Sequence, residues 1–464
     1  MVTDVLRRVG TVNVGLSTFA ESLRAQGAPV VDVDWRPPAS GDPRALELLT
    51  ELWATHGDRI ASGNAEAVAR IEGSAPRALT VAPAGEVVPG LHDGLLLHSG
   101  PPIEWSRVCD PQRRALLAAA VFEGWAPDRA EAERLIERGD IELEPGNAHD
   151  HVGPMTGVCS PSMPVWSVAD EHHGTQAFST LNEGPGRTLW FGVGDDESVD
   201  RLRFFRDTLG PGLARLLEHA GPVDVFGLAA QGLNMGDELH MRSQASGNLL
   251  IRELAPALAA VGDEASARFI AGNHHFFLNL TMAAAKCASL AATGVEGSSV
   301  VSLMARNGTD MGIQLAGLPG RWFTAPAAPV EDALLRDGYG PDDAALDIGD
   351  SAVIECVGLG GMALAAAPAV AGFLGGEAAT AAARTELMGE ICAARSERFR
   401  ITGRDYLGTP VGIDARLVTE LELTPQITTG VLHARSGAGQ IGAGVAHQPL
   451  EPFRAAVEAL AEAL

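Results

Sequence analysis

Residues 273–290 read NHHFFLNLTMAAAKCASL, and they predict a helix that is apolar on every side except one edge. His275, Asn279, Met282 and Lys286 follow one another along this edge at i, i+4, i+7 and i+11. Burial of the edge against other parts of the chain would create a small cleft with two hydrogen-bonding side chains and one point charge. We therefore expect Lys286 and His275 to act in catalysis and Asn279 to bind substrate.

Lys286 is the only lysine in a chain with 34 Lys and Arg residues. A genome rich in G and C replaces lysine by arginine wherever a generic surface cation is sufficient. The exception is informative because an ammonium is compact and has a tunable pKa, whereas a guanidinium is planar and always charged. Two plainer explanations stay open: a lysine left by drift, and a lysine that snorkels to solvent from the end of the helix.

The overall composition excludes several classes of function. The chain has 464 residues, which is enough for about three domains. Its formal net charge of -25 opposes binding to nucleic acid or to an anionic membrane surface. Five widely spaced cysteines without a CxxC pair indicate reduced thiols. The N-terminal residues lack the apolar core of a signal peptide, and the most apolar window, 352–376, is interrupted by Glu355 and Pro368. We expect a cytoplasmic protein.

Periodicity along the chain predicts an α+β multidomain fold with four parts. The first is a small N-terminal Rossmann-like βαβ unit followed by a helical linker, and a mixed α+β domain comes next. A helical insertion with Ala-rich and Leu-rich runs follows, and a second α+β domain ends the chain. The expected boundaries are 1–85, 86–197, 198–292 and 293–464.

Several elements can be assigned individually from their patterns. Helices are expected over 44–71, 111–125 and 127–138. Strands are expected over 187–194 and 351–358, where short apolar runs are bounded by glycine or proline.

Two glycine-rich turns could approach an anion. Gly358, Gly360 and Gly361 fit the G-x-G-x-x-A pattern after the expected strand over 351–358. A second turn over 437–442 fits G-x-G-x-x-G, but no helix follows it at once. Because neither turn has an obvious ribose-binding acid downstream, we expect no dinucleotide and no other cofactor. Substrate binding to exposed backbone N–H groups is the functional alternative, and tight packing of a helix on a strand is the structural one.

Histidines in the segment PGNAHDHVGP could belong to a metal site. His149 and His151 would point the same way on a strand and could share a zinc ion with His172, His173 or His240. The segment is a loop, however, and no HExxH motif or Asp-rich partner accompanies it. We therefore predict a protein without a bound metal, with polar loop contacts and surface histidines as the alternatives.

The segment NMGDELH over 234–240 has two interpretations. Asp237 and Glu238 suit the first turn of a helix that opens at Asp237, where carboxylates complement the helix dipole. Alternatively, Glu238 and His240 face a cleft and act as acid and base. We include both Glu238 and His240 among the catalytic candidates.

A group of polar residues is expected at one end of a sheet. Arg306 and Asn307 stand at the Asn-Gly turn of an expected hairpin, and Arg321 follows closely. Two guanidinium groups there could hold a carboxylate or phosphate by paired hydrogen bonds. The segment DIGDS over 347–351 precedes the next expected strand, and it could cap that strand or orient the arginines. Arg306, Asn307, Arg321, Asp350 and Ser351 are candidates for substrate binding.

Ten motifs occur in the order typical of a known family. They are LLHSGPPIEW, FEGWA, VGPMTGVCSPSMPV, LNEGPGR, QGLNMGDELHMR, FFLNLTMAAAK, MARNGTDMGI, RWFTAP, DIGDSAVIECVGLGGMALAAAP and GAGQIGAG. Together they resemble the YlbE-like family, which includes the AllG-type subunits of oxamate carbamoyltransferase, over residues 90–450. The resemblance implies a multidomain α+β architecture with a helical insertion. Asn182, within LNEGPGR, is a further substrate-binding candidate.

The resemblance implies transfer of a carbamoyl group between carbamoyl phosphate and an amide such as oxamate, in purine or allantoin nitrogen catabolism. It also implies a homo- or hetero-oligomer, because VNVGLSTFAESLRAQGAPVVDVDWRPPA is similar to a segment of FdrA-type partner subunits. Such a reaction needs cations or N–H groups for the phosphate and donors for the carbamoyl oxygen. The Ser-x-Arg-Thr-Arg signature of other carbamoyltransferases is absent.

Two other functions stay open. A metal-dependent amidohydrolase would use His149 and His151, and a non-catalytic scaffold subunit would leave the active site to an FdrA-like partner. A covalent serine or cysteine hydrolase has little support, because no G-x-S-x-G, Walker lysine or Cys-His signature occurs.

Overall fold

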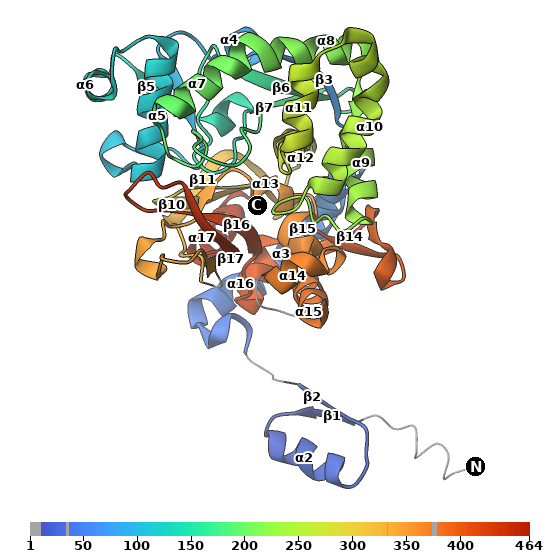
Figure 1. The fold of residues 1–464 in the computed structure, drawn as a ribbon. Coiled ribbons are helices and arrows are strands. Elements are labelled where there is room, and N and C mark those ends of the chain that lie inside the picture. The colour runs from blue at the N-terminus through green and yellow to red at the C-terminus, as the bar shows by residue number, and fades with distance from the viewer. Residues whose placement is uncertain (1–10, 34–36, 332, 374–377) are drawn as a thin grey trace.

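A computed structural model of the protein describes residues 11–33, 37–331, 333–373 and 378–464. Its N-terminal unit consists of strands β1 (Thr11–Val14) and β2 (Val30–Val33), which pair in parallel, and helix α2 (Ser17–Ala25) between them. A βαβ unit is therefore present, but its sheet has two strands and the Rossmann-like character expected from the sequence is not confirmed. Figure 1 shows this unit apart from the main body.

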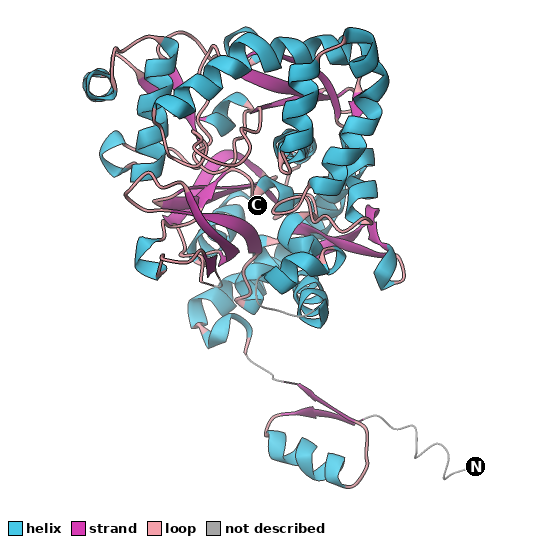
Figure 2. Ribbon diagram, in the orientation of Figure 1, coloured by secondary structure: helices cyan, strands magenta, loops and turns pink. Residues whose placement is uncertain are grey.

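The strands of the main body form small sheets in which antiparallel pairing predominates, and Figure 2 shows strands and helices mixed throughout. The sheet orders are β7-β6-β3-β8, β11-β10-β9-β13, β12-β17-β16, β14-β15 and the parallel pair β4-β5. The bounds are β3 Arg77–Pro83, β4 Leu95–His98, β5 Glu142–Pro145, β6 Pro164–Asp170, β7 Thr175–Thr180, β8 Val223–Asp224, β9 Val301–Asn307, β10 Asp310–Leu315, β11 Leu318–Pro326, β12 Leu334–Leu335, β13 Ile348–Gly349, β14 Cys392–Ile401, β15 Leu407–Ile413, β16 Gln426–Leu432 and β17 Gln440–His447.

The helices lie between and around these sheets (Figure 1). Among the described residues, no helix combines the length and the apolar character needed to span a bilayer. The bounds are α3 Pro43–Gly73, α4 Ala84–Val87, α5 Asp110–Glu123, α6 Arg129–Arg138, α7 Asp196–Phe204, α8 Gly210–Ala220, α9 Val225–Leu233, α10 Gln244–Val261, α11 Glu264–Gly272, α12 Phe276–Ala292, α13 Val353–Cys356, α14 Pro368–Phe373, α15 Ala378–Met388, α16 Ala415–Leu421 and α17 Glu451–Ala463.

Helix α12 is the element around which the main body packs. It is rich in alanine and contains neither glycine nor proline, so the backbone favours a helix. Asn273 prepares its start by accepting a hydrogen bond at Oδ1 from the His275 N–H, at 3.0 Å. The helix contacts β6 and β7 of one sheet, β9 of another, and helices α3, α9, α10 and α13. Every residue of α12 except Leu290 is buried, and most of its apolar side chains belong to the same core cluster as side chains of β6, β9, α3, α9, α10 and α13.

Most elements predicted from periodicity are confirmed. The expected helices over 44–71, 111–125 and 127–138 correspond to α3, α5 and α6, and the Asn-Gly turn joins β9 to β10 in an antiparallel hairpin. The predicted α+β class and the helical run from α7 to α12 are likewise present.

Two predicted strands are wrong. Residues 187–194 form turns, because the buried carboxylate of Glu183 accepts hydrogen bonds from the N–H groups of Leu189 and Trp190 and bends the chain there. Residues 351–358 contain helix α13 instead of a strand. All side chains of α13 are buried, and a run that is apolar on every face has no periodicity to separate helix from strand.

A buried ion pair fastens β9 to the residue that precedes β13. Arg306 donates from Nε and Nη2 to the two carboxylate oxygens of Asp347, at 2.8 and 2.9 Å, and both side chains are fully buried. Its Nη1 donates to the Gly349 carbonyl. Asp347 also accepts from Thr429 and Gln448, both at 3.1 Å. Although burial acts to raise it, the Arg306 charge and these donors hold the pKa of Asp347 below its usual value.

We predict that Arg306→Ala lowers the free energy of unfolding by about 3–5 kcal/mol, because it leaves Asp347 buried without its cation. Arg321→Ala is the matched control: Arg321 is exposed on β11, where it stacks on Phe323, and its loss changes stability by less than about 0.5 kcal/mol. Urea titration of both variants measures the difference. Equal midpoints in the two variants would contradict the assignment.

Candidate functional site

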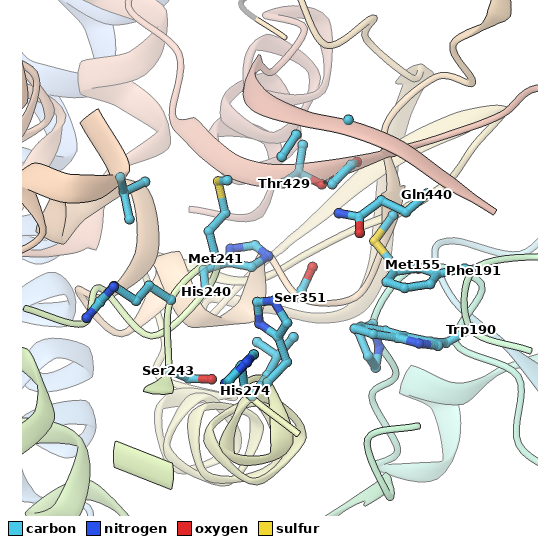
Figure 3. A pocket seen from close by; sticks show the side chains of 18 of the residues that line it. Met155, Trp190, Phe191, His240, Met241, Ser243, His274, Ser351, Thr429 and Gln440 are labelled. Atoms are coloured by element: carbon cyan, nitrogen blue, oxygen red, sulfur yellow. Dashed lines mark hydrogen bonds between the residues drawn. The ribbon is translucent and has the colours of Figure 1, made fainter. Parts of the chain in front are cut away.

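A pocket of about 670 Å³, which we call the central pocket, lies between the N-terminal end of α12 and strands β16 and β17. Figure 3 shows two groups of side chains facing each other across it. His240, Met241, Ser243 and His274 lie on one side. Met155, Trp190, Phe191 and Gln440 lie on the other side.

His240 is the residue of the pocket wall with the best-defined orientation. Its Nδ1 lies 2.8 Å from Glu355 Oε1, and the Glu355 carboxylate is fully buried. A carboxylate can only accept, so Nδ1 carries the proton and Nε2 is left as the nitrogen with a free lone pair. The Gly361 N–H donates to the same Oε1 at 2.9 Å, which fixes the carboxylate in turn. The arrangement is that of a general base held in one tautomer by a carboxylate.

Glu238 does not face the pocket. Its carboxylate accepts from the backbone N–H groups of His240, Met241 and Arg242, at 2.6, 2.5 and 3.2 Å, and thereby shapes the loop that presents His240. Burial raises the pKa of Glu238 to about 7, with His240 acting in the opposite direction.

The helix expected to open at Asp237 starts seven residues later, at Gln244. Asp237 caps it from a distance, because its carboxylate accepts from the N–H groups of Ala245 and Ser246.

The glycine-rich turn at Gly358–Gly361 packs against protein and offers no free cradle for a phosphate. The N–H of Gly360 donates to the Glu238 carbonyl at 2.7 Å, and that of Gly361 to Glu355. A Cβ on Gly361 would lie 2.0 Å from the carbonyl oxygen of Gln426. Close packing, the structural alternative, therefore explains these glycines. The strand expected before the turn is helix α13, so the context of a dinucleotide site is also missing.

The polar edge of α12 is divided between three environments. His275 lines the central pocket with His274, and burial, together with His274 and His240, lowers the pKa of His275. Asn279 is fully used within the protein: it donates to the Thr180 carbonyl at 2.7 Å and accepts from Asn182 at 2.8 Å. Neither Asn279 nor Asn182 lines the pocket, so the expected single cleft along this edge is wrong.

Lys286 lies behind the pocket wall and not at the surface. Its side chain is 5 % exposed, and its Nζ lies 3.5 Å from the Asn147 carbonyl oxygen. Snorkelling to solvent is therefore excluded as its explanation. Burial lowers the pKa of Lys286, while the negative charges of Asp150 and Asp350 act to raise it.

Asp350 connects this lysine to the pocket. Its carboxylate accepts from the N–H groups of Gly100 and Gly153 and from the Asn147 amide, at 2.8, 3.1 and 2.9 Å. Burial raises the pKa of Asp350 to about 7, against the effect of these donors. The next residue, Ser351, lines the central pocket.

The two arginines expected at one end of a sheet are at opposite ends. Arg306 pairs with Met311 beside the hairpin turn, whereas Arg321 lies on β11 toward the turn that joins it to β10. Arg306 is saturated by Asp347, and Asn307 serves the hairpin turn by accepting from two backbone N–H groups. The expected anion clamp of Arg306 and Arg321 is therefore not formed.

Other cations and donors supply the polar part of the pocket. Arg242 and Arg336 line it, and Arg242 Nε lies 3.4 Å from Asp237 Oδ1 while its side chain remains 38 % exposed. Thr429 and Gln440 contribute a hydroxyl and a carboxamide from β16 and β17. The pocket can thus bind an anion near the loop that carries His240. On the side formed by β16 and β17 it can form hydrogen bonds with polar groups of a ligand.

The histidines of the loop at 147–151 do not converge. His149 contacts the Pro89 carbonyl and Glu144 with its two ring nitrogens, at 2.7 and 2.6 Å. His151 is buried, and neither of its ring nitrogens has a hydrogen-bond partner among the residues that the structure describes. Within the described residues, no group of three or more His, Cys, Asp or Glu side chains is arranged to hold a metal ion.

The structure thus brings His240, His275 and Ser351 to the pocket and places Lys286 and Asp350 behind its wall. Glu355, Trp190, Gln440 and the pocket arginines were not predicted as site residues from the sequence. A signal for Glu355 was available, because it is the only carboxylate in the most apolar part of the chain, where a charge requires a partner. The others have no comparable signal.

Comparison with known proteins extends these observations. Residues 141–351 match the family model described as oxamate carbamoyltransferase subunit AllG. The chain is 39% identical to the oxamate carbamoyltransferase subunit AllG of Escherichia coli K12, over 87% of this chain and 98% of that protein. It is 37% identical to the uncharacterized protein YahG of the same organism, over 97% and 96%.

A solved structure has the same fold. The crystal structure of a conserved protein of unknown function from Enterococcus faecalis V583 is 38% identical and superposes with a TM-score of 0.85, over 87% of this chain and 98% of that one. Identity of this degree over nearly the whole of AllG confirms the resemblance inferred from the motifs. The chain therefore belongs to the AllG family of oxamate carbamoyltransferase subunits.

Proposed function

We propose that this chain is the subunit of a carbamoyltransferase in which carbamoyl phosphate and an amide acceptor, oxamate or a related compound, react in the central pocket. The observation that carries the proposal is His240, held in one tautomer by buried Glu355 on a pocket wall that also carries Arg242 and Arg336. The name of the E. coli relative supports the reaction class.

The reaction requires one proton to leave the acceptor nitrogen. The amide nitrogen attacks the carbonyl carbon of carbamoyl phosphate, a C–N bond forms, and the C–O bond to phosphate breaks. His240 Nε2 takes the proton from the nitrogen and can return it to the departing phosphate. In the reverse direction His240 protonates the amide nitrogen while phosphate attacks. Glu355 stabilises the imidazolium in both directions.

The charges of the site suit these reactants. Arg242 and Arg336 would meet the phosphate, and the neutral imidazole of His275 would offer a hydrogen bond to the carbamoyl group. Lys286 and Asp350 act from behind the wall by fixing the segment that carries Ser351. In this proposal Lys286 positions the site and does not touch the reactants.

The relative is named as a subunit, so we propose that this chain also works in an assembly, with an FdrA-like partner subunit, in the cytoplasm. A scaffold role without its own catalysis is the competing interpretation. The test measures phosphate release from carbamoyl phosphate with oxamate and related amides, using this chain with and without the co-expressed products of neighbouring genes. Phosphate release that survives inactivation of His240 in the assembled enzyme would favour the scaffold role.

We predict that His240→Asn lowers kcat by about a hundredfold to ten-thousandfold, because the proton loses its acceptor. Glu355→Gln should also lower kcat, because the carboxylate that holds His240 in one tautomer and stabilises its imidazolium is lost. The control is His173→Asn, which breaks a similar pair, with Asp170 at 2.7 Å, outside the pocket. Equal effects of His240→Asn and His173→Asn on kcat would refute the assignment.

We also predict that Lys286→Arg keeps the fold but loses at least about ninety per cent of the activity. A guanidinium is larger than the space left by the ammonium, so over-packing should cost about 1–3 kcal/mol and displace Asn147 and Asp350. Arg268→Lys on the exposed face of α11 is the reciprocal control. Melting temperature and turnover decide the question, and unaltered turnover in Lys286→Arg would show that this lysine has no part in the site.

A further inference from the structure

The central pocket is larger than the reactants of oxamate carbamoylation require. Oxamate and carbamoyl phosphate together have about fourteen non-hydrogen atoms, which occupy at most about 420 Å³ if each is given the volume of one water molecule, about 30 Å³. The pocket measures about 670 Å³. Pockets of this size can enclose most of the surface of a drug-sized ligand.

The side of the pocket opposite His240 is aromatic and apolar (Figure 3). Trp190 and Phe191 stack on each other with ring centroids 4.1 Å apart and an interplanar angle of 22°, and both line the pocket (Figure 3). The Trp190 indole N–H donates to the Gly184 carbonyl at 3.1 Å, so the ring is fixed. Met155 and Leu335 extend this surface. Oxamate consists of an amide and a carboxylate and has no apolar part that could use it.

A polar group stands beside the aromatic pair. Gln440 on β17 lines the pocket, and its carboxamide forms no hydrogen bond within the described part of the chain. A carboxamide offers one donor face and one acceptor face, which together match the adjacent N–H and C=O of a cyclic amide or ureide. Figure 3 shows Gln440 on the same side of the pocket as Trp190 and Phe191.

We infer that the acceptor of this chain is a planar cyclic amide or ureide, larger than oxamate, whose ring packs against the Trp190–Phe191 pair and whose N–H and C=O edge pairs with Gln440. The inference rests on the proposed carbamoyl transfer and narrows its acceptor. The chain matches uncharacterized YahG over more of its length than it matches AllG, so its family membership does not fix oxamate as the acceptor.

With such an acceptor, the same bonds form and break as with oxamate. A ring nitrogen attacks the carbonyl carbon of carbamoyl phosphate, its proton passes to His240, and phosphate leaves with the oxygen of the broken C–O bond. The product is an N-carbamoyl ring. Atoms and charges balance without an oxidant, a reductant or a further reactant.

The test compares rings with oxamate on the full chain assembled with its partner subunits. Phosphate release from carbamoyl phosphate is measured with hydantoin and uracil as planar ureides and with oxamate and acetamide as open-chain amides. Binding of each compound to the purified full chain is measured in parallel by isothermal titration. We expect kcat/KM for a ring to exceed that for oxamate by about tenfold or more, the gain expected from one aromatic contact.

Substitutions distinguish a direct contact between Trp190 and the ring of the acceptor from a purely structural role of this residue. Trp190→Leu should lower kcat/KM for the ring by about tenfold or more, and by a larger factor than it lowers kcat/KM for oxamate. Gln440→Leu should act in the same direction. Trp190→Phe keeps an aromatic ring and should retain most of the activity, which covers the case in which the leucine variant does not fold. Trp53→Leu, at a half-exposed tryptophan of α3 outside the pocket, is the control.

Oxamate preferred over every ring by the unaltered enzyme, or equal losses for ring and oxamate in Trp190→Leu, would overturn the inference. Another result would show that the proposed carbamoyl transfer itself is wrong. In that case no acceptor releases phosphate, but a ring still binds to the full chain in a manner that depends on Trp190, and a planar cyclic amide or ureide remains the ligand of the pocket.

Discussion

The main body depends on the requirement that a buried carboxylate be met by donors. The short segment from Asp347 to Glu355 carries three of them, Asp347, Asp350 and Glu355, and each is almost completely shielded from water. An unpaired carboxylate in such a place costs several kcal/mol, so the donors must be in position whenever the chain is folded. They come from β9, β16, the loops after β4 and β5, the segment after β17 and the loop that carries His240.

This requirement has a consequence for the pocket. The same segment that ties distant elements together also places Ser351 at the pocket wall and the buried Glu355 against His240. The position of His240 is therefore coupled to the packing of the core. A base must be held within a fraction of an ångström of its productive position for proton transfer to be efficient. A wall fixed by several buried hydrogen bonds meets this condition better than a side chain on an exposed loop.

The sequence predicts the parts of the fold that local chemistry determines. Helices α5 and α6 end in glycines in the left-handed conformation, at Gly124 and Gly139, and the Asn-Gly turn specifies the hairpin of β9 and β10. Helix α13 could not be recognised, because it is buried on all sides. The sequence predicts that the segment over 347–351 caps the next strand or orients the arginines, and Asp347 does bind Arg306. The sequence could not show that this ion pair occupies the guanidinium fully, because an anion site would use the same arginine.

The candidate site likewise contains residues that the local sequence indicates and residues that only the folded structure brings together. His240 and His275 stand out in the sequence because a histidine in a motif suggests acid–base chemistry, and both reach the pocket. Trp190 and Gln440 do not stand out, because aromatic and amide side chains are common in loops and strands. Only the folded structure shows that they face His240 across a pocket. The rarity of Lys286 pointed to a constrained position, and the structure identifies the constraint as burial beside two carboxylates.

The pocket separates the chemistry from the choice of acceptor. His240 and Glu355 come from the loop before α10 and from α13, whereas Trp190 and Gln440 come from the turns after β7 and from β17. Substitutions in the second group can reshape the acceptor side without disturbing the proton acceptor, because the two groups share no hydrogen bond within the described residues. If carbamoyl transfer is the reaction, as we propose, a fold of this kind could serve relatives that carry it out on different amides, with the acceptor chosen by the residues of the pocket wall.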